Sequence, residues 1–356
     1  MIPVLRALPS AVLAACAVGL ASCGGGGGSA APPVAPSSTP TTHPTTTPSA
    51  TPAPTPTPTP SGPTPTPSPP PNTQPIAVAN AGGNDVLIFS PSADGNVAPQ
   101  SSIAGSNTTL AAPAALAVQS GATVSVVNAG GNSVLSFDAT GNVAPSETIV
   151  DTNPGVASFG LAIATAPSFA VYLSSKATSE IDVYTSTNVN GAPAATISGP
   201  LTTLVNPTAM AADRSGNLYV VDGSQIKVFA NAAAGGNIAP SVIAGAATTL
   251  NSPAAVAVDV HGNILVADGT AVKIFAAGSS GDVAPSAVIS GPATGLQNAT
   301  GVAVDGTGAI WVCDAGANAL YRFKAGSTGN ATPLVVVSGA GTTLNDPLAI
   351  ELEPVI

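Results

Sequence analysis

Positively charged residues are scarce in this chain. Lysine and arginine together number 7, against 17 aspartates and glutamates, and the formal net charge is -10. Nucleic acids and anionic lipid headgroups are bound mainly by clusters of positive side chains. The composition therefore excludes a nucleic-acid-binding protein and an electrostatic binder of anionic lipid surfaces.

Cysteine and histidine are also rare. Two of the three cysteines, Cys16 and Cys23, lie near the beginning of the chain, so Cys313 has no disulfide partner in the remainder. We expect Cys313 to be a small buried residue, because no histidine lies near it in sequence to activate a thiolate. His43 is expected to be solvated spacer and His261 an exposed turn residue, so no Ser/His/Asp set is available.

Charged and aromatic residues are few, whereas turn-forming residues are abundant. Charged residues make up 7% of the chain and aromatic residues 3%, while Gly numbers 38 and Pro 36. Such a composition favours tight β turns and small-residue packing over helices. We predict an all-β fold.

The beginning of the chain resembles a bacterial export signal. In residues 1–22, Arg6 precedes the apolar run Ala7–Leu20, which is too short for a comfortable bilayer span. The sequence Leu-Ala-Ser-Cys that ends at Cys23 resembles a lipobox, which implies that Cys23 is lipidated and becomes the first residue. An ordinary signal peptide is the alternative, but Gly24–Gly28, a flexible spacer, favours the lipoprotein. Gly24 after the cysteine implies sorting to the outer membrane.

A tether is expected between this leader and the folded part, so that residues 23–74 connect the anchor to a domain at 75–356. Residues 29–74 are mostly Pro, Thr, Ser and Ala. Proline lacks the donor that a sheet requires, so this segment should be extended or disordered. Its threonines are candidates for glycosylation.

The remainder is built from a repeated unit, seen most clearly in Ser252–Gln297. This stretch divides into four β-type runs, Ala254–Asp259, Asn263–Asp268, Ala271–Ala276 and Ser286–Ser290, separated by turn residues. Four strands in about 46 residues are typical of one β-propeller blade.

A recurring Gly-Asn-Val-Ala-Pro motif, which we call the marker, counts the repeats. Its prolines recur at intervals of 45 to 48 residues: Pro99, Pro145, Pro193, Pro240, Pro285 and Pro333. We place the marker at the turn into the outermost strand, where proline blunts an exposed edge. The sequence therefore predicts a six-bladed propeller.

The two ends of the repeat region complement each other. The region begins with IAVANAGGNDVLIF after Pro75, which matches a second and third strand and lacks an innermost strand. It ends with DPLAIELEP from Asp346, an innermost strand without a blade to follow. We expect the C-terminal strand to complete the N-terminal blade and so close the ring. The innermost strand of the third copy, Phe159–Ile163, is degenerate.

These residues carry a family resemblance. The segments PAAVAVDVHGNILVADGTAVKIF from Pro253, NPTAMAADRSGNLYVVDGSQIKVF from Asn206 and NATGVAVDGTGAIWVCDAGANALYRF from Asn298 resemble the NHL repeat. That family forms six-bladed propellers similar to the TolB and SMP-30 type. The resemblance covers residues 75–356 and is weakest in the third copy. It implies a binding or scaffolding module, since enzymatic relatives add dedicated metal or acid–base residues.

One carboxylate interrupts an otherwise uniform inner ring. Glu351 stands at the fourth position of the closing strand, where other copies have Ala117, Ala211, Ala257 and Ala303. A channel carboxylate with a raised pKa would mark a functional site. We favour the alternative that Glu351 is tolerated because its strand is less enclosed, since general acid–base chemistry needs a second group.

Other acidic residues follow the strands in layers. Asp213, Asp259 and Asp305 end inner strands before Gly-containing turns and are expected to bond their own turn backbone. Asp222, Asp268 and Asp314 end second strands, and Asn80 and Asn128 match them in the first two copies. Turn capping is the favoured role for this second layer. Weak Ca²⁺ binding is the alternative, because hard oxygen ligands suit that ion.

Three functions follow from these observations. The favoured hypothesis is a non-catalytic, lipid-anchored propeller of the bacterial cell envelope, monomeric, that binds a protein or glycan partner, with Cys23 as its membrane attachment. A lactonase- or lyase-type enzyme with a channel metal is the second, and a passive spacer is the third. No catalytic residue, metal ligand or cofactor is predicted.

The third-strand aromatics are expected to pack between neighbouring blades: Phe89, Phe137, Tyr184, Phe229, Phe275 and Phe323.

Overall fold

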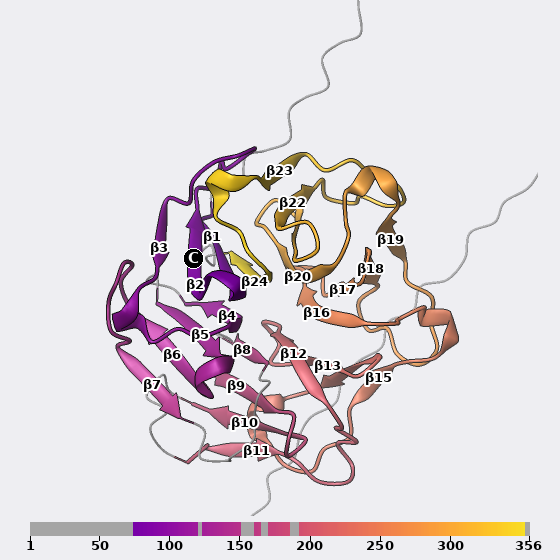
Figure 1. Ribbon diagram of the computed structural model, residues 1–356. Helices are drawn as coiled ribbons and strands as arrows, with labels where there is room; N and C mark the ends of the chain where they lie inside the picture. Colours follow the sequence, from indigo (N-terminus) through magenta and orange to yellow (C-terminus); the bar gives the residue numbers. More distant parts are fainter. Residues whose placement is uncertain (1–73, 120–122, 151–159, 165–169, 186–191, 353–356) are drawn as a thin grey trace, which may run out of the picture. The chain divides into compact units, whose positions relative to one another are not determined.

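The computed structural model describes residues 74–119, 123–150, 160–164, 170–185 and 192–352. Six four-stranded antiparallel sheets surround a common axis (Figure 1), so the predicted six-bladed β-propeller is confirmed. In this described part, no helix has the length and apolarity needed to cross a bilayer. The predicted export signal, the lipidation site Cys23, His43 and the tether up to residue 73 lie outside the described residues.

Every blade begins with an inner strand beside the axis and ends with an outer strand at the rim. Blade 1 contains β24 (Pro347–Leu352), β1 (Ile76–Asn80), β2 (Asp85–Phe89) and β3 (Ser101–Ile103). Blade 2 contains β4 (Pro113–Val118), β5 (Val124–Asn128), β6 (Ser133–Phe137) and β7 (Glu147–Val150). Blade 3 contains β8 (Leu161–Ala164), β9 (Ala170–Ser175), β10 (Glu180–Tyr184) and β11 (Ala195–Ile197).

The last three blades follow the same order. Blade 4 contains β12 (Pro207–Ala212), β13 (Leu218–Asp222), β14 (Gln225–Phe229) and β15 (Ser241–Ile243). Blade 5 contains β16 (Pro253–Val258), β17 (Ile264–Asp268), β18 (Ala271–Phe275) and β19 (Ala287–Ser290). Blade 6 contains β20 (Ala299–Val304), β21 (Ile310–Asp314), β22 (Ala319–Phe323) and β23 (Val335–Ser338).

The core lies between the blades. The second strands are buried at every residue, because the faces of each blade pack against its two neighbours. Strands buried on both faces have nearly continuous apolar sequences, as in Leu218–Asp222 (LYVVD). The outer strands are only three or four residues long, which limits the exposed edge of each sheet.

The third-strand aromatics pack between blades, as predicted. Phe229 of blade 4 shares a hydrophobic cluster with Ile181 and Tyr172 of blade 3, and Phe275 of blade 5 shares another with Val221 and Ile226 of blade 4. All six of these aromatic residues are buried. Their regular recurrence therefore reflects packing rather than a ligand platform.

The ends of the repeat region close the ring as predicted. β24 pairs with β1 in antiparallel register, with Ile76 opposite Leu352 and Ala77 opposite Glu351. β24 also packs against the inner strands β20 and β4 of the neighbouring blades. The inner strand of blade 1 is thus supplied by the C-terminal segment of the chain.

The markers precede the outer strands, as predicted, and also join neighbouring blades. The marker glycine forms a single parallel bridge with the outer strand of the preceding blade, as between Gly281 and Ile243. The next residue, Asp282, accepts a hydrogen bond from Ala247 N–H at 2.6 Å. The same contacts link Gly95 with Val337 across the closure. The proline was predicted to blunt an exposed edge, but the glycine of the same marker pairs with the outer strand of the preceding blade.

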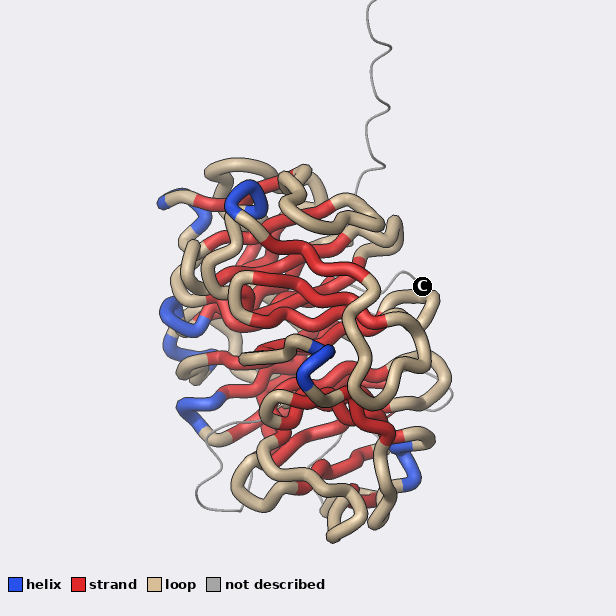
Figure 2. The backbone as a smooth tube through the Cα atoms, turned by 90° about the vertical axis from the view of Figure 1, so that its right-hand side faces the viewer, coloured by secondary structure: helices blue, strands red, loops and turns tan. Residues whose placement is uncertain are grey.

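The ring has two faces, defined here by their turns. The cap face carries the turns between second and third strands and the loops between blades, including η1 (Ala81–Gly83), η2 (Ser106–Thr108), η3 (Ala129–Gly131), η5 (Ala246–Thr248), η6 (Pro292–Thr294) and η7 (Ala340–Thr342). The pocket face carries the turns between inner and second strands, the markers and η4 (Ala232–Ala234). Figure 2 shows loops at both edges of the strand layer.

Candidate functional site

The carboxylates that end the second strands lie on the cap face and are bonded to the loop that enters their own blade. Asp268 accepts hydrogen bonds from the N–H groups of Asn251 (3.1 Å) and Ser252 (2.6 Å), and it forms a buried ion pair with Lys273. Lys273 also donates to the carbonyl of Thr249. The carboxylate therefore fixes the path of the chain into β16.

The same arrangement recurs around the cap face. Asp222 accepts from Val205 and Asn206 N–H and pairs with Lys227, and Asp314 accepts from Gln297, Asn298 and Ala317 N–H. The amide oxygens of Asn80 and Asn128 accept from Asn345 and Ala111 N–H, both at 2.6 Å. The capping interpretation therefore describes this layer, although most of the capped residues precede the inner strand and only Ala317 follows its aspartate. A Ca²⁺ ion at Asp222, Asp268 or Asp314 would have to displace these donors.

On the pocket face, the aspartates that end inner strands bond their own turns, as predicted. Asp213 accepts from Ser215 N–H (2.8 Å), Asn217 N–H (2.9 Å) and the Tyr219 hydroxyl (3.0 Å). Burial acts to raise the pKa of Asp213, but these hydrogen bonds outweigh it and hold the pKa below its usual value. Burial and the neighbouring Asp213 in turn raise the pKa of Tyr219 to about 12.

Asp305 holds the corresponding turn of blade 6 and a buried arginine. It accepts from Thr307 N–H (2.8 Å) and from Nε (3.0 Å) and Nη2 (2.8 Å) of Arg322, whose guanidinium lies over the Trp311 ring. Burial acts to raise the pKa of Asp305, but the hydrogen bonds from Thr307 and Arg322 outweigh it, so the pKa lies below its usual value. Asp259 accepts from His261 N–H and Asn263 N–H, both at 2.8 Å.

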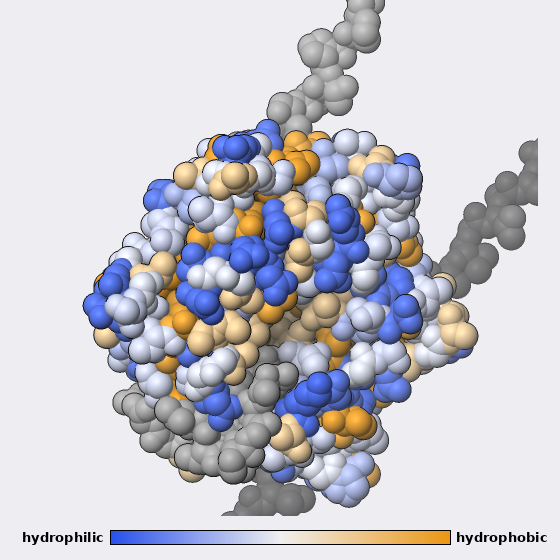
Figure 3. All heavy atoms as spheres, in the orientation of Figure 1, coloured by the Kyte–Doolittle hydropathy of each residue, from blue (hydrophilic) through white to orange (hydrophobic). Residues whose placement is uncertain are grey.

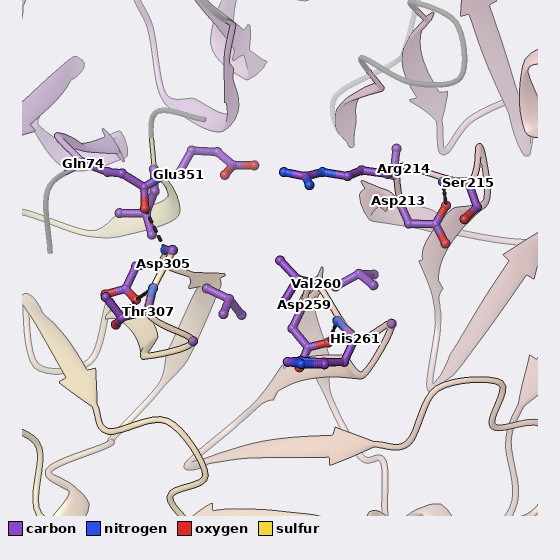
Figure 4. A pocket seen from close by; sticks show the side chains of 17 residues that line it. Gln74, Asp213, Arg214, Ser215, Asp259, Val260, His261, Asp305, Thr307 and Glu351 are labelled. Atoms are coloured by element: carbon purple, nitrogen blue, oxygen red, sulfur yellow. Dashed lines mark hydrogen bonds and ion pairs between the residues drawn. The ribbon is translucent and has the colours of Figure 1, made fainter. Parts of the chain in front are cut away.

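These turns surround a pocket of about 610 Å³ (Figure 4). Its lining comes from blades 4, 5, 6 and 1, through residues 212–215, 258–262, 304–308 and 351–352, together with Gln74. Gln74, the last residue of the predicted tether, is buried and accepts a hydrogen bond from Gly306 N–H at 2.9 Å. The folded part therefore includes Gln74, one residue before its predicted beginning.

Glu351 projects into this pocket. It retains some access to solvent, but burial raises the pKa of its carboxyl to about 7, against a weaker opposing effect of the Leu352 N–H. Its strand is packed between β20 and β4 in the same way as the other inner strands. The interpretation that Glu351 is tolerated in a less enclosed strand was therefore wrong, and its other interpretation, a channel carboxylate with a raised pKa, describes its surroundings.

Arg214 is the pocket residue that sequence reasoning missed. It is exposed in the turn between β12 and β13, and its guanidinium points across the pocket (Figure 4). A signal was present, because the whole chain has only 7 lysines and arginines and this one stands in a turn otherwise built from small polar residues. His261 also lines the pocket, but its side chain is 80% exposed and its Nδ1 lies 3.8 Å from Asp259 Oδ2.

The described residues offer little for metal or thiol chemistry. Among them, no three His, Cys, Asp or Glu side chains are grouped so that they could hold a metal ion. Cys313 is buried, and burial raises the pKa of its thiol to about 12, as expected for a small packed residue. The third inner strand is β8 at Leu161–Ala164, and Phe159, predicted to begin it, lies outside the described residues.

Comparison with known proteins supports the fold and leaves the site open. No family model matches the sequence, and no curated protein matches it. A solved protein of unknown function from Bacteroides caccae is similar in structure (TM-score 0.55, 13% identity, 78% of this chain and 98% of that one). A functionally unknown protein from Desulfotomaculum acetoxidans DSM 771 gives a TM-score of 0.54 at 12% identity, covering 79% and 99% of the two chains.

An enzyme is also among the similar structures. A catalytically inactive virginiamycin B lyase from Staphylococcus aureus, solved with quinupristin, has a TM-score of 0.51 and 12% identity, and the match covers 74% of this chain and 85% of that one. At such identities the likeness concerns the propeller fold alone.

Proposed function

We propose that this propeller is a non-catalytic binding module of the bacterial cell envelope, tethered through lipidated Cys23, and that the pocket receives a group from its partner. The observation that carries the proposal is the pocket itself, a hollow of about 610 Å³ whose described lining comes from four blades and mixes polar with apolar groups. Concave sites of this size with a few convergent polar groups are typical ligand sites. The resemblance to NHL repeats supports the same kind of function.

A protein partner fits the pocket better than a glycan. Carbohydrate sites commonly stack sugar rings on exposed aromatic side chains, whereas the third-strand aromatics are buried between blades. The described lining of the pocket contains no Phe, Tyr or Trp. On the face seen in Figure 3, hydrophilic and hydrophobic side chains are interspersed over the described residues, as on an ordinary protein surface.

The two faces provide a matched test of this proposal. Val260 lies in the pocket and Val205 on the cap face, and they are 79% and 72% exposed. A photo-crosslinking amino acid is placed at one or the other position of the full-length chain, which is then irradiated in envelope preparations. We expect a partner to be crosslinked from position 260 and not from position 205. Capture from position 205 alone would contradict the proposal. Capture from neither position would also contradict it and would favour the passive spacer.

An acid–base enzyme is the second candidate, favoured by Glu351, whose pKa of about 7 suits proton transfer in a pocket. The structural likeness to a lyase suggests an assay in which quinupristin is incubated with the full-length chain and followed by mass spectrometry. We expect the compound to remain intact. Conversion that the Glu351→Gln variant abolishes would replace the binding proposal with the enzymatic one.

A further inference from the structure

Two side chains of opposite charge face each other across the pocket. Glu351 extends from β24 of blade 1 and Arg214 from the β12–β13 turn of blade 4, and Figure 4 shows the carboxylate and the guanidinium pointing toward one another. The ion pairs of the described residues join other groups, Lys227, Lys273, Arg322 and His261 to their aspartates, and do not join these two. The space between the two side chains therefore belongs to the pocket.

The remaining charges of the pocket are already engaged. Asp213 and Asp259 each accept hydrogen bonds from the backbone of their own turns, and Asp305 also binds Arg322. These contacts hold the turns in place and leave little capacity for a ligand. Among the described residues of the lining, the charged groups directed into the open volume are thus Glu351 on one wall and Arg214 on the opposite one.

We propose that this pocket binds a ligand that carries both an ammonium group and a carboxylate, with the ammonium at Glu351 and the carboxylate at Arg214. The inference rests on the binding function proposed above and specifies its ligand. A guanidinium presents paired donors that match a carboxylate, and such charge-assisted bonds are the stronger ones. A carboxylate shielded from water without a cation is costly, and an ammonium group compensates for that cost.

The rest of the lining suits the segment between the two charged ends. Val260 presents an exposed apolar side chain, and the partly buried Val258 and Val304 also belong to the lining, as does Ser215. Methylene groups or a short peptide backbone fit such a mixed surface. The chemistry is shared by free amino acids and by peptides with free ends, so the test includes both.

The experiment uses the full-length chain and a graded series of zwitterions, namely glycine, β-alanine, γ-aminobutyrate and ε-aminocaproate, with trialanine as the peptide arm. Binding is measured by calorimetry and by ligand-observed NMR. We expect one length of the series, or trialanine, to bind best. Butylamine, butyrate and trialanine blocked at both ends should bind at least about tenfold more weakly, because each lacks one or both charged contacts.

Matched variants locate the two ends of the ligand. We expect Glu351→Gln and Arg214→Ala each to weaken binding of the best zwitterion by about tenfold or more. Glu147→Gln on β7 and Lys324→Ala after β22, both outside the pocket lining, should leave it unchanged. In Arg214→Ala, the zwitterion should lose its advantage over butylamine, which carries the ammonium group but no carboxylate. Arg214 is exposed, so this variant keeps the fold if Glu351→Gln does not.

Failure of this inference is distinguishable from failure of the binding function. If crosslinking from position 260 captures a partner while none of the zwitterions binds, the ligand chemistry is wrong and the binding module stands. If a zwitterion binds equally well to the wild type and to both variants, the assignment to Glu351 and Arg214 is overturned. Equal binding of butyrate and the zwitterion would also overturn it.

Discussion

The two faces of the ring use the same kind of side chain in opposite ways. On the cap face, Asp222 and Asp268 are buried and satisfied by backbone N–H groups and a lysine. On the pocket face, burial raises the pKa of Glu351 to about 7, and the ion pairs of the described residues do not include its carboxylate. A carboxylate surrounded by donors holds a fold together, whereas one held without a counterion is the chemically available group.

Comparison among the blades strengthens this distinction. In blades 4 and 5, Asp222 and Asp268 occur with Lys227 and Lys273. In blades 1 and 2, neutral Asn80 and Asn128 occur with buried Leu87 and Leu135 at the positions of the lysines. In blades 4 and 5, charge on the cap face thus occurs together with its partner, whereas Asp314 of blade 6 is satisfied by backbone N–H groups. Glu351 replaces an alanine of the other copies without such a partner on a neighbouring strand.

The largest effect is expected where a buried pair is broken. Asp268→Ala leaves Lys273 buried without its carboxylate, and we expect the free energy of unfolding to fall by about 3–5 kcal/mol. The measurement is the midpoint of chemical unfolding at neutral pH.

A control for this variant is provided by the other blades. The double variant Asp268→Asn with Lys273→Leu reproduces the pairs of blades 1 and 2, and it should unfold within about 1 kcal/mol of the wild type. The asparagine still accepts from the loop, as Asn128 does from Ala111. Equal destabilisation of the single and double variants would show that the unpaired lysine is not the cause.

The next effect depends on pH and concerns Glu351. Its carboxyl has a raised pKa when folded, so the unfolded chain loses this proton first as the pH rises, and stability falls between about pH 4.5 and 7. Among the described polar groups, the Arg214 guanidinium points toward it and Gln74 lies beside it (Figure 4). Glu351→Gln removes this loss, and we expect a gain of up to about 3 kcal/mol at pH 8 and none at pH 4.

Thermal unfolding of the wild type and this variant across the pH range measures the effect. Val205→Ser on the cap face, which changes no titratable group, is the control and should not change the pH dependence. A constant difference between wild type and Glu351→Gln at all pH values would contradict the raised pKa.

Much of this fold was predictable because its signals are local or repeated. The six markers and their spacing count the blades, and the surplus inner strand at Pro347–Leu352 predicts the closure. The turns at Asp213 and Asp259 were also predictable, since the bonded N–H groups lie two and four residues further along the chain.

The cap and the pocket were harder to predict because their contacts depend on how the blades are placed. Asp268 bonds residues that precede it by 16 and 17 positions, across the blade. The approach of Glu351 and Arg214 depends on ring closure, because they belong to blades 1 and 4.

One repeated signal in the sequence was available and was not used. Each Gly-x-x-Thr segment before an inner strand has a buried threonine that donates to the glycine carbonyl, as Thr248 does to Gly245 at 2.7 Å.

A smaller effect is expected from Asp213, whose pKa is lowered. Its hydrogen bonds stabilise the folded state above the pKa of an unfolded aspartate, and this stability is lost as the pH falls through the lower folded value. Asp213→Asn should therefore cost about 1 kcal/mol at pH 7 and nothing near pH 2. Tyr219 gives a second readout, because removal of the charge should lower its pKa from about 12 in an ultraviolet titration. An unchanged Tyr219 would contradict the contact.

The smallest effects are expected at the two exposed valines, and they compare the faces most directly. Val260→Ser and Val205→Ser should each change the free energy of unfolding by less than about 0.5 kcal/mol, since both side chains are mostly exposed. Val260→Ser should weaken the best zwitterion by about two- to fourfold, because it removes apolar contact from the pocket. Val205→Ser should leave binding unchanged. If both substitutions weaken binding equally, the ligand does not distinguish the faces, and Glu351 loses its assigned role.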